Sequence, residues 1–231
     1  MGRQKRWVVL SKLYSLTYKQ VKEILLHVSE AIASREGYLT DLDRECGDGD
    51  FGVGMYRGFT LARQQLENYQ GNDIGELFSK TGYAITSSVG GASGPVFGML
   101  FITIGSKLRG KEEVTLDELA DAFRAAVEAI IKLGGARPGD KTMVDALIPA
   151  VEAIEEAVKL KESIVTAYTK AAEAAKTGAE ATKNMIAKKG KASYLGEKTL
   201  GHPDPGAAAV ALIFQSFSEK LEKIHSPLKT N

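Results

Sequence analysis

The chain has 231 residues and is 44% hydrophobic, which is enough for one large domain or two small ones and excludes an intrinsically disordered protein. It carries 30 basic and 29 acidic residues, a balance that argues against a general nucleic-acid binder, and its single cysteine, Cys46, excludes an intramolecular disulfide. The longest apolar run, residues 207–214, is too short for a membrane helix, and the first residues lack a signal-peptide core, so we expect a cytoplasmic protein.

The dominant periodicity along the chain is helical, with apolar residues recurring at i, i+3, i+4 and i+7. It predicts helices near residues 12–34, 36–45, 52–69, 73–88, 92–108, 116–133, 142–160, 162–188 and 205–223. The first two are interpreted as one broken helix, which gives about eight in all. No convincing alternating pattern appears, so strands are expected to be absent or few.

Capping residues mark several of these helix starts. Thr17 with Gln20, and Thr115 with Glu118, have the spacing of capping boxes. Asp73 is the expected N-cap of the helix that follows it. Long helices joined by short connections favour antiparallel neighbours, so the sequence predicts an all-α bundle.

The glycines gather in four connections, at residues 47–58, 90–98, 134–139 and 190–206. A turn between two helices needs only one or two residues of this kind. These connections also carry Asp, Ser, Thr and Lys, and loops held by a rigid scaffold are where functional sites tend to lie. The four loops are therefore the candidate functional segments.

The first loop is acidic. Asp43, Asp48 and Asp50 lie within eight positions, separated by glycines that allow a tight bend. Three carboxylates at one turn repel one another and resist ionisation, and a divalent cation removes that penalty. Mg²⁺ prefers carboxylate oxygens and leaves room for phosphate oxygens. The alternative is a solvated Asp/Gly turn that ends a helix.

The second loop, residues 87–95, has two hydroxyls, then two glycines, then a helix start. Backbone N–H groups at a helix N-terminus favour anions, so this segment is a candidate phosphate site. A glycine-rich turn that permits close helix packing explains it equally well.

The other two loops also precede helices. In residues 134–145, Asp140 or Thr142 is expected to cap the next helix, and Lys141 could reach a phosphate or pair with an acid. In residues 191–206, Asp204 is the expected cap with Pro205 at the first helical position. His202, the histidine of this segment, is interpreted as a structural hydrogen-bonding residue.

Together and in this order, the four loops resemble the L subunit of dihydroxyacetone kinase (DhaL), which is equivalent to the nucleotide-binding domain of single-chain dihydroxyacetone kinases. The resemblance rests on residues 42–45 with 47–50, and on 87–95, 138–143 and 192–206. It spans nearly the whole chain as a single domain, residues 1–231, with flexible tails expected at 1–11 and 225–231. It implies an all-α, eight-helix antiparallel barrel with the nucleotide site at one end.

The resemblance also implies the site residues. Asp43, Asp48 and Asp50 correspond to the carboxylates that hold two Mg²⁺ ions, which bridge the phosphates of ADP or ATP. The nucleotide-contacting positions are a turn (Phe51, Gly52, Val53, Gly54), two hydroxyls (Ser87, Ser88), the base and ribose pocket (Gly134, Met143, Lys191) and its closing segment (Asp204, Pro205, Gly206). The chain departs from the family's usual residues at Phe51, Gly54, Tyr56 and Lys191. No catalytic side chain is assigned, because transfer is metal-assisted.

The function implied by the resemblance is that of a phosphotransferase subunit in glycerol metabolism, of the phosphoenolpyruvate-dependent type. In that system a DhaM-type phosphoprotein recharges bound ADP, and the ATP formed phosphorylates dihydroxyacetone held on a separate DhaK-type subunit. Phosphoryl transfer depends on positioning and charge neutralisation, which carboxylates for metal and N–H groups for phosphate would supply.

Three other functions stay open. The chain could use exchangeable ATP on another small ketose such as erythrulose. It could be a nucleotide-sensing coregulator of a transcription factor, without catalysis. It could also be a purely structural bundle, although that reading gives no reason for the clustered acids. A homodimer also stays open, and neither nucleic acid nor a membrane is expected as a partner.

Overall fold

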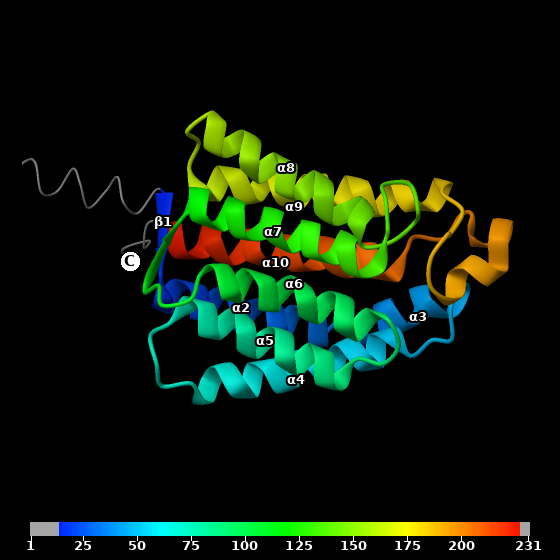
Figure 1. The fold of residues 1–231 in the computed structure, drawn as a ribbon, viewed down its shortest axis with the longest axis horizontal. Coiled ribbons are helices and arrows are strands. Elements are labelled where there is room, and N and C mark those ends of the chain that lie inside the picture. The colour runs from blue at the N-terminus through cyan, green and yellow to red at the C-terminus, as the bar shows by residue number, and fades with distance from the viewer. Residues whose placement is uncertain (1–13, 227–231) are drawn as a thin grey trace, which may run out of the picture.

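A computed structural model describes residues 14–226. Eight of its helices form a closed ring, in which each packs against the next in chain order and the last packs against the first. They are α2 (Tyr18–Ala33), α4 (Phe51–Asn68), α5 (Ile74–Ser88), α6 (Ser93–Lys107), α7 (Leu116–Gly134), α8 (Val144–Lys159), α9 (Ile164–Ala181) and α10 (Pro205–His225). The expected eight-helix antiparallel barrel is thereby confirmed (Figure 1).

A further helix, α3 (Glu36–Cys46), follows α2 after a two-residue turn and lies at one end of the ring (Figure 1). It packs against α4 and α10. The prediction of one broken helix for the first two segments describes this pair, because the chain changes direction between them. The expected flexible tails lie outside the described residues except for His225 and Ser226, of which His225 ends α10.

Local side-chain caps explain why several helices begin where they do. Both capping boxes are present: the hydroxyls of Thr17 and Thr115 accept from the amides of Gln20 and Glu118, whose side chains accept in return. Asp73 caps α5. These caps satisfy amides that no earlier carbonyl reaches, which is why the sequence located the starts of α5 and α7 closely.

Two segments differ from the predicted helices. The helix expected from residue 12 begins only at Tyr18, because Ser15–Thr17 is a short strand, β1, paired antiparallel with β2 (Glu113–Thr115). This pairing ties the start of α2 to the start of α7. The helix expected to reach residue 188 ends at Ala181, and short 3-10 turns follow it at Thr182–Asn184 (η1) and Lys191–Thr199 (η2).

The ring is filled by apolar side chains from every one of its helices. Tyr168 is wholly buried and stacks on Phe217 with ring centroids 4.2 Å apart. On the other side of the ring, α5 and α6 approach closely through glycines. A Cβ on Gly98 would lie 1.8 Å from the hydroxyl of Thr86, so only glycine permits this spacing.

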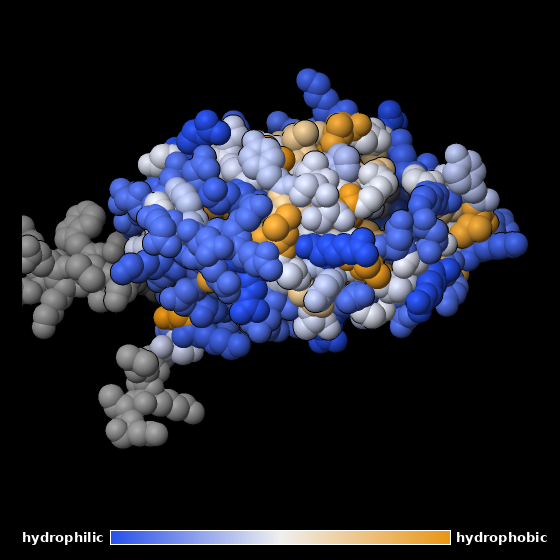
Figure 2. Space-filling model, turned by 90° about the horizontal axis from the view of Figure 1, so that it is seen from below, coloured by the Kyte–Doolittle hydropathy of each residue, from blue (hydrophilic) through white to orange (hydrophobic). Residues whose placement is uncertain are grey.

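The connections that the sequence marked as functional all lie at one end of the barrel. The turns α3–α4, α5–α6 and α7–α8, and the long segment between α9 and α10, gather at the right-hand end of Figure 1, opposite β1. Hydrophilic residues predominate on the face drawn in Figure 2, where apolar residues form small separate groups. Across the described residues, no helix combines the length and apolarity needed to cross a membrane.

Candidate functional site

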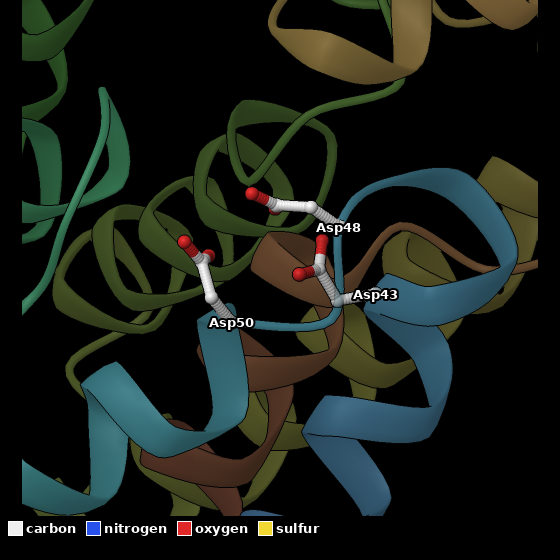
Figure 3. A group of neighbouring side chains, drawn as sticks. All are labelled: Asp43, Asp48 and Asp50. Atoms are coloured by element: carbon white, nitrogen blue, oxygen red, sulfur yellow. The ribbon is translucent and has the colours of Figure 1, made fainter.

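The acidic turn joins α3 to α4. Asp43 comes from the last turn of α3, whereas Asp48 and Asp50 lie in the turn itself (Figure 3). One carboxylate oxygen of each lies within 4.8 Å of the others, so the expected cluster forms. Two glycines make the bend: a Cβ on Gly47 would meet Asp43 Oδ1 at 2.4 Å, and Gly49 has a φ of +75°, which side chains rarely allow.

The electrostatics of this turn favour a bound cation. Desolvation raises the pKa of Asp43, and the charges of Asp48 and Asp50 raise it further. The backbone amide of Phe51 opposes this by donating to Asp43 Oδ2 at 3.1 Å. A hard divalent cation would stabilise all three ionised carboxylates at once, so the donor set fits Mg²⁺.

Lys191 already supplies one positive charge at this turn. Its ammonium donates to Asp48 and lies 3.9 Å from Asp50 Oδ2. This hydrogen bond lowers the pKa of Asp48 and raises that of Lys191. The partners are 143 positions apart in the chain, so the segment between α9 and α10 folds back over the acidic turn. A cationic side chain at this position is suited to contact phosphate as well.

The predicted turn at residues 51–54 is the first turn of α4. The Phe51 side chain is buried and packs on Phe97, with centroids 5.8 Å apart, so it faces the core. Gly52 packs against α3, and Gly54 lies beneath Val89 of the α5–α6 connection. Val53 is partly buried. The nucleotide role of these residues stays a prediction, and the contacts favour backbone groups for it.

Three further predicted residues lie at the ends of helices facing this end of the barrel. Ser87 and Ser88 form the last turn of α5, where the Ser87 hydroxyl donates to Ala84 O at 3.0 Å. Gly134 ends α7 and is exposed. Their proposed contacts with nucleotide stay predictions.

Met143 and the Asp204-Pro205-Gly206 segment, which were predicted to line one pocket, do lie next to each other. A Cβ on Gly206 would lie 3.4 Å from Met143 Cβ, so the start of α10 lies against the start of α8. Asp204 caps α10 by accepting from Ala207 N at 2.7 Å, with Pro205 at the first helical position, as the sequence predicted. Desolvation raises the pKa of Asp204 to about 7, although hydrogen bonds from Ala207 and Gly206 lower it.

The α7–α8 loop is arranged differently from the expectation. Met143 occupies the N-cap position of α8 but makes no side-chain cap bond. The hydroxyl of Thr142, one residue earlier, accepts from Val144 N at 3.2 Å, so of the two expected caps Thr142 supplies the side-chain bond and Asp140 does not. Asp140 instead accepts from Arg137 N within its own loop. Lys141 neither faces solvent nor pairs with an acid: it is 2% exposed, and its ammonium donates to backbone carbonyls.

Thr182 is a residue that the sequence analysis missed. It was assigned to the interior of a long helix, yet it is the C-cap of α9, is fully buried, and accepts from Asp204 N through its hydroxyl at 2.8 Å. The Asn at position 184, a common residue at helix ends, was the available signal.

Comparison with known proteins is consistent with this geometry. The DAK2 domain matches residues 45–219. The ADP-binding subunit DhaL of the PEP-dependent dihydroxyacetone kinase of Escherichia coli K12 is 40% identical over 201 residues, covering 87% of this chain and 96% of that one. D-erythrulose kinase of Mycolicibacterium smegmatis is 36% identical over 194 residues, 83% of this chain but 33% of its own length.

A solved structure shares the fold. The dihydroxyacetone kinase of C. freundii, crystallised with AMP-PNP and Mg²⁺, superposes with a TM-score of 0.65 at 30% sequence identity. The match covers 86% of this chain and 33% of that one. This chain therefore spans about a third of the length of that enzyme.

Proposed function

The chain belongs to the DAK2 domain family, and from this premise we propose that it is the ADP- or ATP–magnesium-binding subunit of a dihydroxyacetone kinase. The observation that carries the proposal is the cluster of Asp43, Asp48 and Asp50 at one end of the barrel, with the ammonium of Lys191 against it. An exposed structural turn gives no reason for three carboxylates to converge, since each raises the cost of ionising the others.

Asp43, Asp48 and Asp50 would hold Mg²⁺, with two ions expected. When bound, the metal supplies neutralisation of the phosphate charge that builds up during transfer. Asp43 is held in place by the amide of Phe51, so its orientation is fixed before any ligand arrives. The family resemblance places Lys191 in the base and ribose pocket, whereas its ammonium lies against Asp48. We therefore assign it to phosphate, for which it would exchange the contact with Asp48.

The nucleotide would lie between the acidic turn and the neighbouring loops. Of the predicted turn Phe51, Gly52, Val53 and Gly54, the amides of Gly52 and Val53 are available at the N-terminus of α4, a position that favours anions. The amide of Phe51 donates to Asp43 and that of Gly54 donates to Asp50 O. We assign phosphate contact to Ser87 and Ser88, and the base and ribose to Gly134, Met143 and the Asp204-Pro205-Gly206 segment. The packing of Met143 beside Gly206 supports this assignment, because it brings the start of α8 against the start of α10.

The phosphoryl acceptor would be bound elsewhere. The chain matches almost the full length of the E. coli ADP-binding subunit but only a third of the erythrulose kinase and of the C. freundii enzyme. The match leaves about two thirds of each longer enzyme uncovered. We infer that a DhaK-type subunit presents the ketose and that a DhaM-type phosphoprotein recharges the bound ADP.

A second candidate is the same chemistry with exchangeable ATP and erythrulose as acceptor, which the 36% identity to D-erythrulose kinase favours. Gel filtration of the native protein followed by mass spectrometry separates the two. ADP and Mg²⁺ retained on the protein support recharging in place, and a protein free of nucleotide that turns over added ATP with a K-type subunit supports the second candidate.

The site itself is tested by Asp48→Asn in an ADP titration with Mg²⁺ present. Loss of one metal carboxylate should weaken nucleotide binding about 100-fold, equivalent to about 3 kcal/mol. Asp41→Asn is the matched control, because Asp41 lies on α3 but is exposed and pairs with Arg44. Equal ADP affinity of the Asp48 variant and the wild type, with helicity unchanged, would refute the assigned site.

A further inference from the structure

Lys141 is a buried cation to which the proposed function gives no role. Its side chain is 2% exposed, and an ammonium in such surroundings is costly unless hydrogen bonds compensate it. Its backbone φ is +60°, in the left-handed region that residues with a Cβ rarely adopt. A residue that bears both costs is held there by strong local contacts.

Those contacts are two backbone carbonyls. Lys141 Nζ donates to Thr182 O at 2.7 Å and to His202 O at 2.5 Å. The long segment between α9 and α10 is hereafter the 183–203 loop. Thr182 O comes directly before this loop, where the chain leaves the barrel, and His202 O lies at the end of the loop, where the chain returns. One ammonium therefore bridges both ends of the loop.

Backbone groups join the same two ends. Gly201 N donates to Lys183 O at 2.8 Å, and Asp204 N donates to the hydroxyl of Thr182 at 2.8 Å. These bonds and the two bonds from Lys141 form the neck of the loop. Without the ammonium, Thr182 O would keep only the amide of Met185, at 3.1 Å, and His202 O would lose its bond from Nζ, which favours opening of the neck.

The 183–203 loop carries Lys191 to the acidic turn. Lys191 contacts Asp48 and Asp50, and Lys188 N donates to Asp140 O at 3.0 Å. The loop thus touches both the acidic turn and the loop that contains Lys141 itself. Its far end continues into Asp204, which caps α10 beside Met143.

We propose that Lys141 is a positioning residue, which holds the neck of the 183–203 loop closed and thereby places Lys191 over the carboxylates of the acidic turn. The proposal deepens the proposed function, because the loop so placed would cover the metal and nucleotide. Direct contact of Lys141 with phosphate does not fit the geometry, since two of its three donors are aimed at the neck.

The first test uses nucleotide-free protein and compares amide hydrogen exchange of Lys141→Met with wild type. Amides of the 183–203 loop should exchange at least about tenfold faster, while those of α4–α6 keep their wild-type rates. Lys198→Met is the matched control, because it removes an exposed charge from the same loop and should change neither set. Equal acceleration across all helices would assign Lys141 to the scaffold and overturn the proposal.

The second test measures ADP affinity in the presence of Mg²⁺. Lys141→Met should bind about tenfold more weakly, and Lys141→Arg, which keeps the charge and its donors, should recover to within about threefold of wild type. Because Lys141 acts through Lys191, the double variant with Lys191→Ala should bind no more weakly than Lys191→Ala alone, within about twofold. A loosened loop with unchanged ADP affinity, or additive losses in the double variant, would overturn it.

A third measurement uses the wild-type protein, so it can be made even if Lys141→Met does not fold. Acetylation of amines, followed by mass spectrometry, should modify Lys141 far more slowly than Lys198. Mg²⁺ with ADP should lower the acetylation rate of Lys141 at least about fivefold further. If closure of the neck strengthens ADP binding, ADP binding must also favour the closed neck, because coupling between sites is reciprocal. Equal rates with and without ADP, where ADP is bound, overturn the proposal. If wild type binds no ADP, the proposed function fails, and the exchange test alone decides whether Lys141 closes the neck.

Discussion

Replacing Gly52 by alanine tests the contact that holds the two helices of the acidic turn together. Gly52 lies in the first turn of α4 and faces α3. A Cβ there would lie 2.2 Å from the hydroxyl of Thr40, 2.4 Å from Glu36 O and 2.5 Å from Thr40 N. Two of these atoms belong to the backbone of α3 and cannot rotate away.

The cost follows from these distances. Nonbonded contact needs about 3.5 Å, so the two helices must move apart by about 1 Å. Overpacking of this kind costs about 1–3 kcal/mol, and a backbone clash belongs at the upper end. Alanine returns about 1 kcal/mol of helix propensity relative to glycine. We therefore expect Gly52→Ala to lower the free energy of unfolding by about 2 kcal/mol, which is about 4–8 °C in Tm.

The assay is urea denaturation followed by circular dichroism, combined with a Mg²⁺ and ADP titration of the folded variant. Separation of α3 from α4 also moves Asp43 away from Phe51 N, so ADP affinity should fall with stability. Gly37→Ala is the control on the same helix, because its added Cβ has nothing within 4 Å and should be neutral or stabilising by up to about 1 kcal/mol. An unchanged unfolding midpoint for Gly52→Ala would refute the packing argument.

Two further substitutions test the barrel itself. Tyr168→Phe removes a buried hydroxyl for which the described residues offer no hydrogen-bond partner. This substitution should raise the free energy of unfolding by about 1 kcal/mol. A loss of stability would mean that the hydroxyl has a partner. Glu155→Gln breaks the two-bond pair with Arg124 that joins α7 to α8, and should cost about 1 kcal/mol at pH 7 in thermal unfolding. The hydrogen bond from Arg124 lowers the pKa of Glu155 below 4.5. The stability difference between wild type and Glu155→Gln should therefore disappear as the pH falls from 4.5 through the pKa of the folded protein. Glu156→Gln, in an exposed pair with Lys159, is the control and should differ little from wild type at pH 7 or at low pH.

The metal and nucleotide assignments can be separated from the fold by these experiments. Gly52→Ala couples the two, because the same close approach packs α3 on α4 and orients Asp43. Asp48→Asn affects the site alone, since the Asp48 side chain is half-exposed and contributes no core contact. If Gly52→Ala weakens ADP binding and Asp48→Asn does not, the acidic turn has a structural role and does not bind the metal.

Much of the helical framework was readable from the sequence. The apolar periodicity and the caps at Thr115 and Asp73 act over three or four positions, so local reasoning located the starts of α7 and α5 closely. The helix predicted from residue 12 extended past the cap at Thr17, where α2 in fact begins. The cluster of Asp43 and its neighbours was readable for the same reason, because eight positions of glycine-rich chain hold the acids together.

The contacts that complete the site were decided only in three dimensions. The sequence left Lys141 as a candidate phosphate contact, whereas the fold buries it against the carbonyls of Thr182 and His202, 41 and 61 positions away. The family resemblance placed Lys191 in the base and ribose pocket of the same site, and only the fold puts its ammonium against Asp48, 143 positions away. Periodicity and caps report interactions within one or two helical turns, whereas pairing between distant loops depends on which helices become neighbours when the ring closes.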